Sequence, residues 1–193
     1  MYNFEGDKNE AILTGRIVSM IQTNDGQNGG LSLTLDCGRK NYPKVFVNEN
    51  VLGNKRDALF PGVVVSISAN LQHSHRKVKE GTKLSFGVWA DEIEIFYEDM
   101  ESLPLFSRVF YISGKIKNIR KKMSHSNQLH IVILLECHNN GRMALVPITV
   151  FNPKWMPKVD DYFQCCGEIE TWKRQDEKGN TRYFESYVAK SYI

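Results

Sequence analysis

Alternating apolar and polar positions predict strands along most of the chain, and the clearest pattern lies near its end. Two runs rich in aromatic and β-branched residues, Tyr162–Arg174 and Thr181–Tyr192, flank a polar turn at Gln175–Asn180. Within this turn, Gly179 and Asn180 supply the residue types that tight turns prefer. The pattern therefore predicts an antiparallel hairpin.

The same order of strand-like runs occurs twice, about one hundred residues apart. Ala11–Val18 matches Phe110–Lys117, with a hydroxyl residue, a glycine, a cation and an isoleucine in register. Leu31–Cys37 matches Ile131–Cys137, and each run ends in an acid followed by a cysteine. Three further runs follow in matching order, so we expect two units of five strands each.

In the first unit, we expect strands over Ala11–Ile21, Leu31–Cys37, Tyr42–Val47, Val63–Gln72 and Leu84–Phe96. The segments between them are predicted to be a loop, a basic turn, a weakly helical or irregular connection and a basic loop: Thr23–Gly30, Gly38–Asn41, Val51–Leu59 and His73–Lys79. Alternation places Phe86 and Trp89 on opposite faces of the last strand, so at most one of them is expected to face outward.

The second unit is expected to repeat this plan. Its first three strands are predicted at Arg108–Ile119, Ile131–Cys137 and Leu145–Val150, with a polar loop over Met123–Gln128. Between the units, an acidic stretch containing Pro104 has no periodicity and is predicted to be a linker. We place the first domain at residues 1–98, the linker at 99–106 and the second domain at 107–193.

Five strands per unit is the strand count of the OB-fold, a small, partly open Greek-key barrel. We therefore predict an all-β chain made of two tandem five-stranded OB-fold barrels. The groove of an OB-fold lies on its second and third strands, bordered by the loops after the first and fourth strands, and it binds oligonucleotides or oligosaccharides.

The charged residues are distributed unevenly along the chain, and this distribution bears on the kind of partner that the protein binds. Residues 1–103 hold 11 lysines and arginines against 14 acids, net −3, and residues 104–193 hold 14 against 8, net +6. Six of the acids lie between Asp91 and Glu101, so both compact units are mildly basic. Basic surfaces are consistent with a polyanionic partner, although solubility explains a net charge of +3 equally well.

The densest cationic cluster lies at the end of the first strand of the second unit. A basic run alone is usually a solvated face, but at the first loop of an OB-fold it lies at the mouth of the groove. We therefore predict that this cluster binds phosphates. Its members are Lys115, Lys117, Arg120, Lys121 and Lys122.

The final hairpin carries rings interleaved with cations: Trp172, Lys173, Arg174, Arg182 and Tyr183. Such a surface can stack bases and neutralise phosphates. The alternative is a solvated hairpin with some of these rings in the core. Strand alternation makes Trp172 face outward if Ile169 faces the core.

A longer motif in this hairpin resembles a known family. A glycine after an apolar strand, a basic and aromatic shoulder, D-x-x-G-x-x-R-Y and a last strand with V-A resemble the final hairpin of bacterial and phage-type single-stranded DNA-binding proteins. The residues that carry the resemblance are Gly167, Trp172, Lys173, Arg174, Asp176, Gly179, Arg182, Tyr183, Val188 and Ala189.

The resemblance implies further binding residues. Tyr42 and Lys44 occupy the place of the family's aromatic and cation that open strand three, and Phe151 that of its stacking aromatic at the end of this strand. Trp155 either stacks on a base or caps the bottom of the barrel. Other basic residues complete the predicted nucleic-acid-binding set: Arg16, Arg39, Lys40, Arg76, Lys77 and Lys154.

The chain also departs from the family. It stops at Ile193 without a glycine-rich, acid-tipped tail, so we do not expect it to recruit replication and repair proteins by that route. The family's usual chain has one OB domain and forms tetramers. Two domains resemble the two-domain members, which reach four folds as a homodimer.

Enzyme chemistry is not predicted. His73 and His75 lie on an expected loop without enough further ligands for zinc, and nucleophile, metalloprotease and phosphate-loop motifs are absent from the sequence. The four cysteines lack C-x-x-C spacing and indicate a reduced, cytoplasmic protein. A polar N-terminus and short apolar runs predict no signal peptide and no membrane helix. No cofactor or metal is expected.

These observations predict a protein that coats single-stranded DNA with little sequence preference during replication, recombination or transfer. RNA stays open as a ligand. The alternative is an OB-fold scaffold that docks a polymerase, primase or helicase and binds nucleic acid weakly or not at all.

Overall fold

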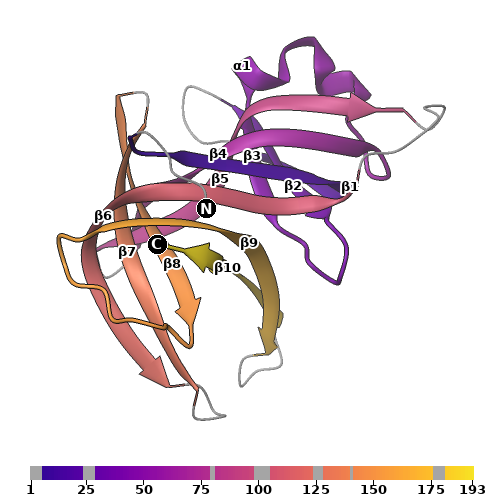
Figure 1. The fold of residues 1–193 in the computed structure, drawn as a ribbon. Helices are drawn as coiled ribbons and strands as arrows, with labels where there is room; N and C mark the ends of the chain where they lie inside the picture. The colour runs from indigo at the N-terminus through magenta and orange to yellow at the C-terminus, as the bar shows by residue number, and fades with distance from the viewer. Residues whose placement is uncertain are drawn as a thin grey trace.

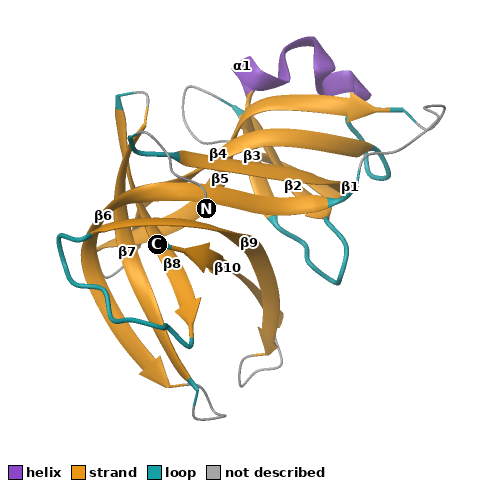
Figure 2. Cartoon of the chain, in the orientation of Figure 1, coloured by secondary structure: helices purple, strands orange, loops and turns teal. Residues whose placement is uncertain are grey.

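The computed structural model describes residues 6–23, 29–78, 81–97, 105–123, 128–139, 141–175 and 181–193. Its elements are β1 (Asn9–Thr23), β2 (Gly30–Asp36), β3 (Lys44–Asn48), α1 (Glu49–Leu52), η1 (Gly53–Ala58), β4 (Val64–Val78), β5 (Gly81–Phe96), β6 (Ser107–Met123), β7 (Leu129–Asn139), β8 (Arg142–Phe151), β9 (Tyr162–Gln175) and β10 (Thr181–Tyr192). The predicted all-β class is therefore confirmed (Figure 2). None of these described helices is long and apolar enough to cross a membrane.

The ten strands form one hydrogen-bonded sheet in the order β2-β3-β5-β4-β1-β6-β7-β8-β10-β9. Additional pairings, β2 with β1 and β6 with β9, close each set of five strands into its own ring of pairings. The two halves meet where β1 and β6 run antiparallel, from Asn9 opposite Ile112 to Thr14 opposite Ser107 (Figure 1). The units predicted as separate are thus joined by a continuous ladder.

The repeat seen in the sequence is also a repeat of burial. On β2, Leu31, Leu33 and Leu35 are buried, and the residues one hundred positions later on β7 are buried in the same way. The residues between them are half-buried. Alternation with period two therefore places one face of each strand in the core.

Two glycines occupy equivalent places in the repeat because two strands approach closely there. A Cβ on Gly15 would lie 2.5 Å from the carbonyl oxygen of Asp36, and one on Gly114 would lie 2.1 Å from that of Glu136. In each half the register then shifts within three residues, between Ile17 and Ser19 and between Ile116 and Asn118. A bulge after a glycine lets the first strand bend and pair on both edges.

Several strands are longer than the sequence predicts. The basic segment expected as a loop at His73–Lys79 belongs to β4 as far as Val78, where it pairs with the start of β5. Likewise β6 continues through Arg120 and Lys121 to Met123. Polar residues at successive positions of these strand ends give no alternation to detect, and on β6 the residues from Arg120 to Met123 are exposed.

Parts of the predicted connections lie outside the described residues. These are residues 99–104 of the linker, 176–180 of the hairpin turn, 24–28 of the first loop and 124–127 of the polar loop. The connection expected at Val51–Leu59 contains the end of α1 and all of η1. Asn48 caps α1, since its side-chain oxygen accepts the Val51 N–H at 3.0 Å.

Three of the four cysteine thiols are buried in the core. Burial raises the pKa of Cys37 to about 12 and raises the pKa of Cys137 and Cys165 above the usual value, while Cys166 is half-buried. The thiolate is the reactive form.

We expect Ellman's reagent to label no thiol faster than Cys166 in the native protein, and all four in denaturant. Rapid native labelling of Cys37 would contradict this packing.

Candidate functional site

Among the clefts lined by described residues of both halves, two adjoin each other. The first, here called the central cleft, has a volume of about 630 Å³. Its rings come from both halves, and it also contains two lysines and one acid: Tyr42, Phe46, Phe86, Trp89, Phe184, Lys44, Lys122 and Glu185. Phe46 packs edge-on against Trp89, with ring centroids 6.2 Å apart.

The second, here called the outer cleft, has a volume of about 820 Å³ and shares Tyr42, Lys44 and Thr171 with the central cleft. Its other lining residues combine a ring, cations and exposed apolar side chains: Trp172, Lys40, Lys173, Val18 and Ile21, with Ser19 and Thr34. The two clefts therefore adjoin and present rings beside cations along one path.

Hydrogen bonds between the two halves fix the position of the path that the two clefts form. The N–H of Thr171 on β9 donates to the side-chain oxygen of Asn41 at 2.8 Å, and the Tyr42 N–H donates to the Thr171 hydroxyl at 2.7 Å. At the start of β3, the Lys44 N–H donates to Glu185 Oε1 of β10 at 2.6 Å. The start of β3 and the residues just before it are thus docked on the second half's final hairpin.

The central cleft also uses the strand faces on which an OB-fold groove is expected. Ser32 and Phe46 come from the outward positions of β2 and β3, between buried neighbours. Val132 and Thr149 come from equivalent positions of β7 and β8. Both halves therefore turn their second and third strands toward one cleft.

Trp172 lies as strand alternation predicts. Ile169 is fully buried, whereas Trp172 is 48% exposed. Its indole stacks on Phe184 with ring centroids 4.6 Å apart and 18° between the planes, and its N–H donates to the Ser186 hydroxyl at 3.2 Å. The ring is therefore held in a fixed orientation at the edge of the outer cleft.

The cationic cluster of β6 divides into two parts. Lys115 pairs with Asp160 at 3.0 Å and Lys117 with Glu136 at 3.1 Å. The hydrogen bond from Lys117 lowers the pKa of the Glu136 carboxyl. Arg120, Lys121 and Lys122 are exposed toward the end of the strand, and Lys122 lines the central cleft.

Several other predicted residues line neither cleft. Arg16 donates to the Gly62 carbonyl, and Arg39 is exposed in the turn before β3. Phe151 lies 5.5 Å from the His130 ring, and Lys154 is exposed, with its backbone N–H donating to the Tyr192 hydroxyl. Their roles stay predictions.

Trp155 was predicted either to stack on a base or to cap the barrel bottom. Its ring lies 6.4 Å from that of Phe163 and 6.5 Å from that of Tyr192, measured between centroids. Phe163 is buried. This packing favours the capping role.

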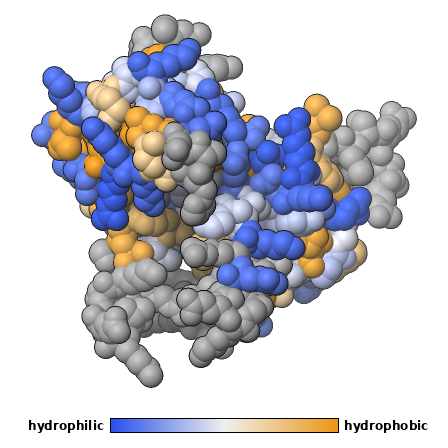
Figure 3. Space-filling view, turned by 90° about the horizontal axis from the view of Figure 1, so that it is seen from below, coloured by the Kyte–Doolittle hydropathy of each residue, from blue (hydrophilic) through white to orange (hydrophobic). Residues whose placement is uncertain are grey.

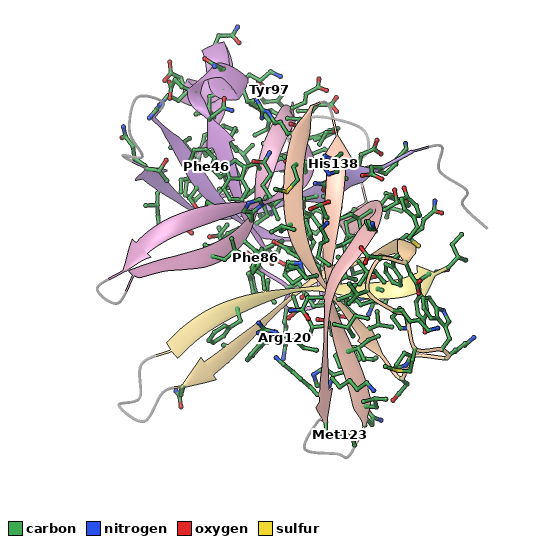
Figure 4. The ribbon with its side chains drawn as sticks, turned by 90° about the vertical axis from the view of Figure 1, so that its left-hand side faces the viewer. Phe46, Phe86, Tyr97, Arg120, Met123 and His138 are labelled. Carbon is green, nitrogen blue, oxygen red and sulfur yellow. The ribbon has the colours of Figure 1, made fainter. Side chains whose placement is uncertain are left out.

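Five predicted side chains lie outside the described part of the chain: those of Arg76, Lys77, Arg174, Arg182 and Tyr183. The strands that carry them are described. Figure 4 shows that the β4–β5 and β9–β10 hairpins extend toward the same side of the molecule, with Phe86 on the first.

Sequence reasoning missed most rings of the central cleft. Phe46 and Phe184 were not singled out, although each lies at an outward position of a strand. Phe86 and Trp89 were expected on opposite faces of β5, and both line the cleft, while Phe86 also packs against the core.

Glu185 is the unexpected member of the site. Its side chain is half-buried, and this burial raises the pKa of its carboxyl to about 7, against the opposing effects of the Lys44 N–H and the Lys44 charge.

Over the described ranges, no cluster of three or more His, Cys, Asp or Glu side chains could hold a metal ion. On the face seen in Figure 3, hydrophobic patches alternate with hydrophilic residues.

This fold is also found among single-stranded DNA binding proteins of known structure. The wild-type single-stranded DNA binding protein of Thermus aquaticus superposes with a TM-score of 0.72 and 15% sequence identity, over 98% of this chain and 93% of that one. A deletion mutant of the Thermus protein gives a TM-score of 0.72 and 14% identity, over 97% and 94%. No protein-family model and no curated protein matches the chain by sequence. The likeness shows the fold, and it agrees with the resemblance seen in the final hairpin.

Proposed function

We propose that this protein binds single-stranded DNA with little sequence preference. The observation that carries the proposal is the pair of adjoining clefts, in which rings alternate with lysines across both halves. The fold is that of the Thermus aquaticus single-stranded DNA binding protein, which gives independent support. Binding of this kind needs no catalytic group, so we propose a binding protein and not an enzyme.

Each ring of five strands is proposed to be one OB-fold barrel, with the domains at residues 1–98 and 107–193. Strand number and pairing order support this, because each set of five closes on itself. The outward faces of the second and third strands of both barrels then contribute to one groove.

The mechanism is passive. Lysines of the clefts neutralise phosphates and release condensed counterions, which favours binding at low salt. The rings stack on bases, and each such contact contributes about 1–3 kcal/mol. In the cell, the protein would coat exposed strands during replication, recombination or transfer, in the cytoplasm and as a homodimer.

The test is a titration of fluorescent single-stranded DNA, single-stranded RNA and duplex DNA. Four lysines of the described part line the clefts, Lys40, Lys44, Lys122 and Lys173. If each contacts one phosphate of a single strand, affinity should fall about 50-fold between roughly 50 and 200 mM salt. Duplex DNA should bind more weakly. A protein that bound no single strand at low salt would instead support the scaffold alternative.

Stacking and charge can be separated on the hairpin. Trp172→Ala should weaken binding by about 1–3 kcal/mol with little change in the salt slope. Lys173→Ala should weaken binding modestly and make the slope shallower by about one unit. Fluorescence titrations at several salt concentrations measure both quantities.

Trp155→Ala is the matched control. Its ring packs on Phe163 and Tyr192 outside both clefts, so the variant should melt at a lower temperature and bind normally. If Trp172→Ala lost thermal stability and kept full affinity, Trp172 would have only a packing role.

A further inference from the structure

Glu185 places an acid where a polyanion is proposed to bind. One carboxylate oxygen accepts the Lys44 N–H. No second hydrogen bond or ion pair joins this side chain to the part of the chain that the structure describes, and the residue lines the central cleft. The carboxylate therefore has acceptor capacity left for a ligand.

The surroundings of Glu185 restrict what that ligand can be. Phosphates are repelled by a carboxylate and find cations at Lys44 and Lys122, which line the same cleft. The rings of Phe46 and Trp89 offer stacking surfaces there. A base stacked on one of these rings would bring its hydrogen-bonding edge to the carboxylate.

We propose that Glu185 reads this edge and gives the central cleft a preference for guanine. This inference rests on the proposed function. Guanine presents two adjacent N–H donors, at N1 and at the exocyclic amino group, which match the two oxygens of a carboxylate. Thymine presents one N–H between two carbonyl oxygens, and both oxygens are repelled by the acid. The protein would then bind any single strand, and a strand that contains guanine would bind most tightly with the guanine at Glu185.

The test compares oligonucleotides that differ by one group. The full-length protein is titrated at pH 8.5, where the carboxylate is ionised, with a thymidine strand of roughly 15 nucleotides. The same strand is then used with one central guanine or one hypoxanthine, which lacks only the exocyclic amino group. We expect guanine to bind about five- to tenfold more tightly than hypoxanthine.

Glu185→Gln should abolish this difference, because the amide has only one acceptor oxygen and cannot accept both N–H groups of guanine. Glu185→Asp, which keeps the charge but shortens the reach, should reduce it. The matched control is Glu170→Gln on the same hairpin, where the acid pairs with Lys190 at 2.6 Å and lines neither cleft. This variant loses the same charge and should keep the guanine preference.

The outcomes separate the two proposals. If the parent binds all three strands equally well, the proposed function stands and the role of Glu185 is wrong. A preference that persists in Glu185→Gln also overturns it, since stacking alone would then explain the result. If no strand binds, the proposed function itself fails.

Discussion

Replacing Gly167 with alanine is expected to lower the free energy of unfolding by about 3 kcal/mol. A Cβ at this position would lie 2.1 Å from the carbonyl oxygen of Val188 and 2.6 Å from the ring of Phe110. Phe110 is fully buried on β6, and Val188 belongs to the neighbouring strand. Neither backbone nor core ring can move away without disturbing the junction of β6, β9 and β10. Urea unfolding followed by circular dichroism measures the loss.

Gly29→Ala serves as the control. The nearest atom to a Cβ there is the Thr23 carbonyl oxygen at 3.9 Å, an ordinary contact. Its stability should stay within about 0.5 kcal/mol of the parent. Equal stability of the two variants would mean that β9 does not approach β6 and β10 as closely as the structure has it.

Glu185→Gln is expected to stabilise the protein at alkaline pH and not at acid pH. The pKa of this carboxyl is about 7 in the folded protein against 4.5 as its ordinary value. Between these values the folded state binds the proton more tightly than the unfolded state, so the stability of the parent falls as the pH rises. The ionised form therefore costs on the order of 2–3 kcal/mol above pH 7. Glutamine avoids this cost, and its amide oxygen can still accept the Lys44 N–H.

Calorimetry of parent and variant from pH 5 to pH 9 gives the difference directly. The charged groups around Glu185 are the same in both proteins, Lys44 and Lys122 of the cleft, and burial raises the pKa of Tyr187 so that it stays neutral. Glu170→Gln, which removes an exposed and paired acid, should show no such pH dependence. A melting difference that is constant with pH would show that Glu185 does not titrate near neutrality.

Much of the fold follows from local pattern. Leu31–Cys37 alternates clearly because one face of the strand is buried, and Ile131–Cys137 matches it by ending in an acid and a cysteine, which made the repeat visible. The long ends of β4 and β6 could not be predicted, because polar side chains on both faces carry no alternation. Backbone hydrogen bonds to a neighbouring strand hold these strand ends in place, and such bonds produce no recognisable pattern of side chains in the sequence.

The candidate site was predicted less completely for a similar reason. Trp172 and Tyr42 could be found because the hairpin and strand three carry a family motif. Phe46, Phe184 and Glu185 depend on how two distant strands meet, which no local pattern encodes. Lys115 and Lys117 belong to a dense basic run, yet their partners Asp160 and Glu136 are remote in sequence or lie across a strand pair.

The hydrogen bonds that dock β3 on the final hairpin have a consequence for the lifetime of a complex. A strand released from the outer cleft is still held at the adjoining central cleft, so its free end stays at high local concentration and rebinds before it diffuses away. Departure then requires that both contacts open together. Strands long enough to fill both clefts should leave far more slowly than short ones, while their arrival rates stay alike.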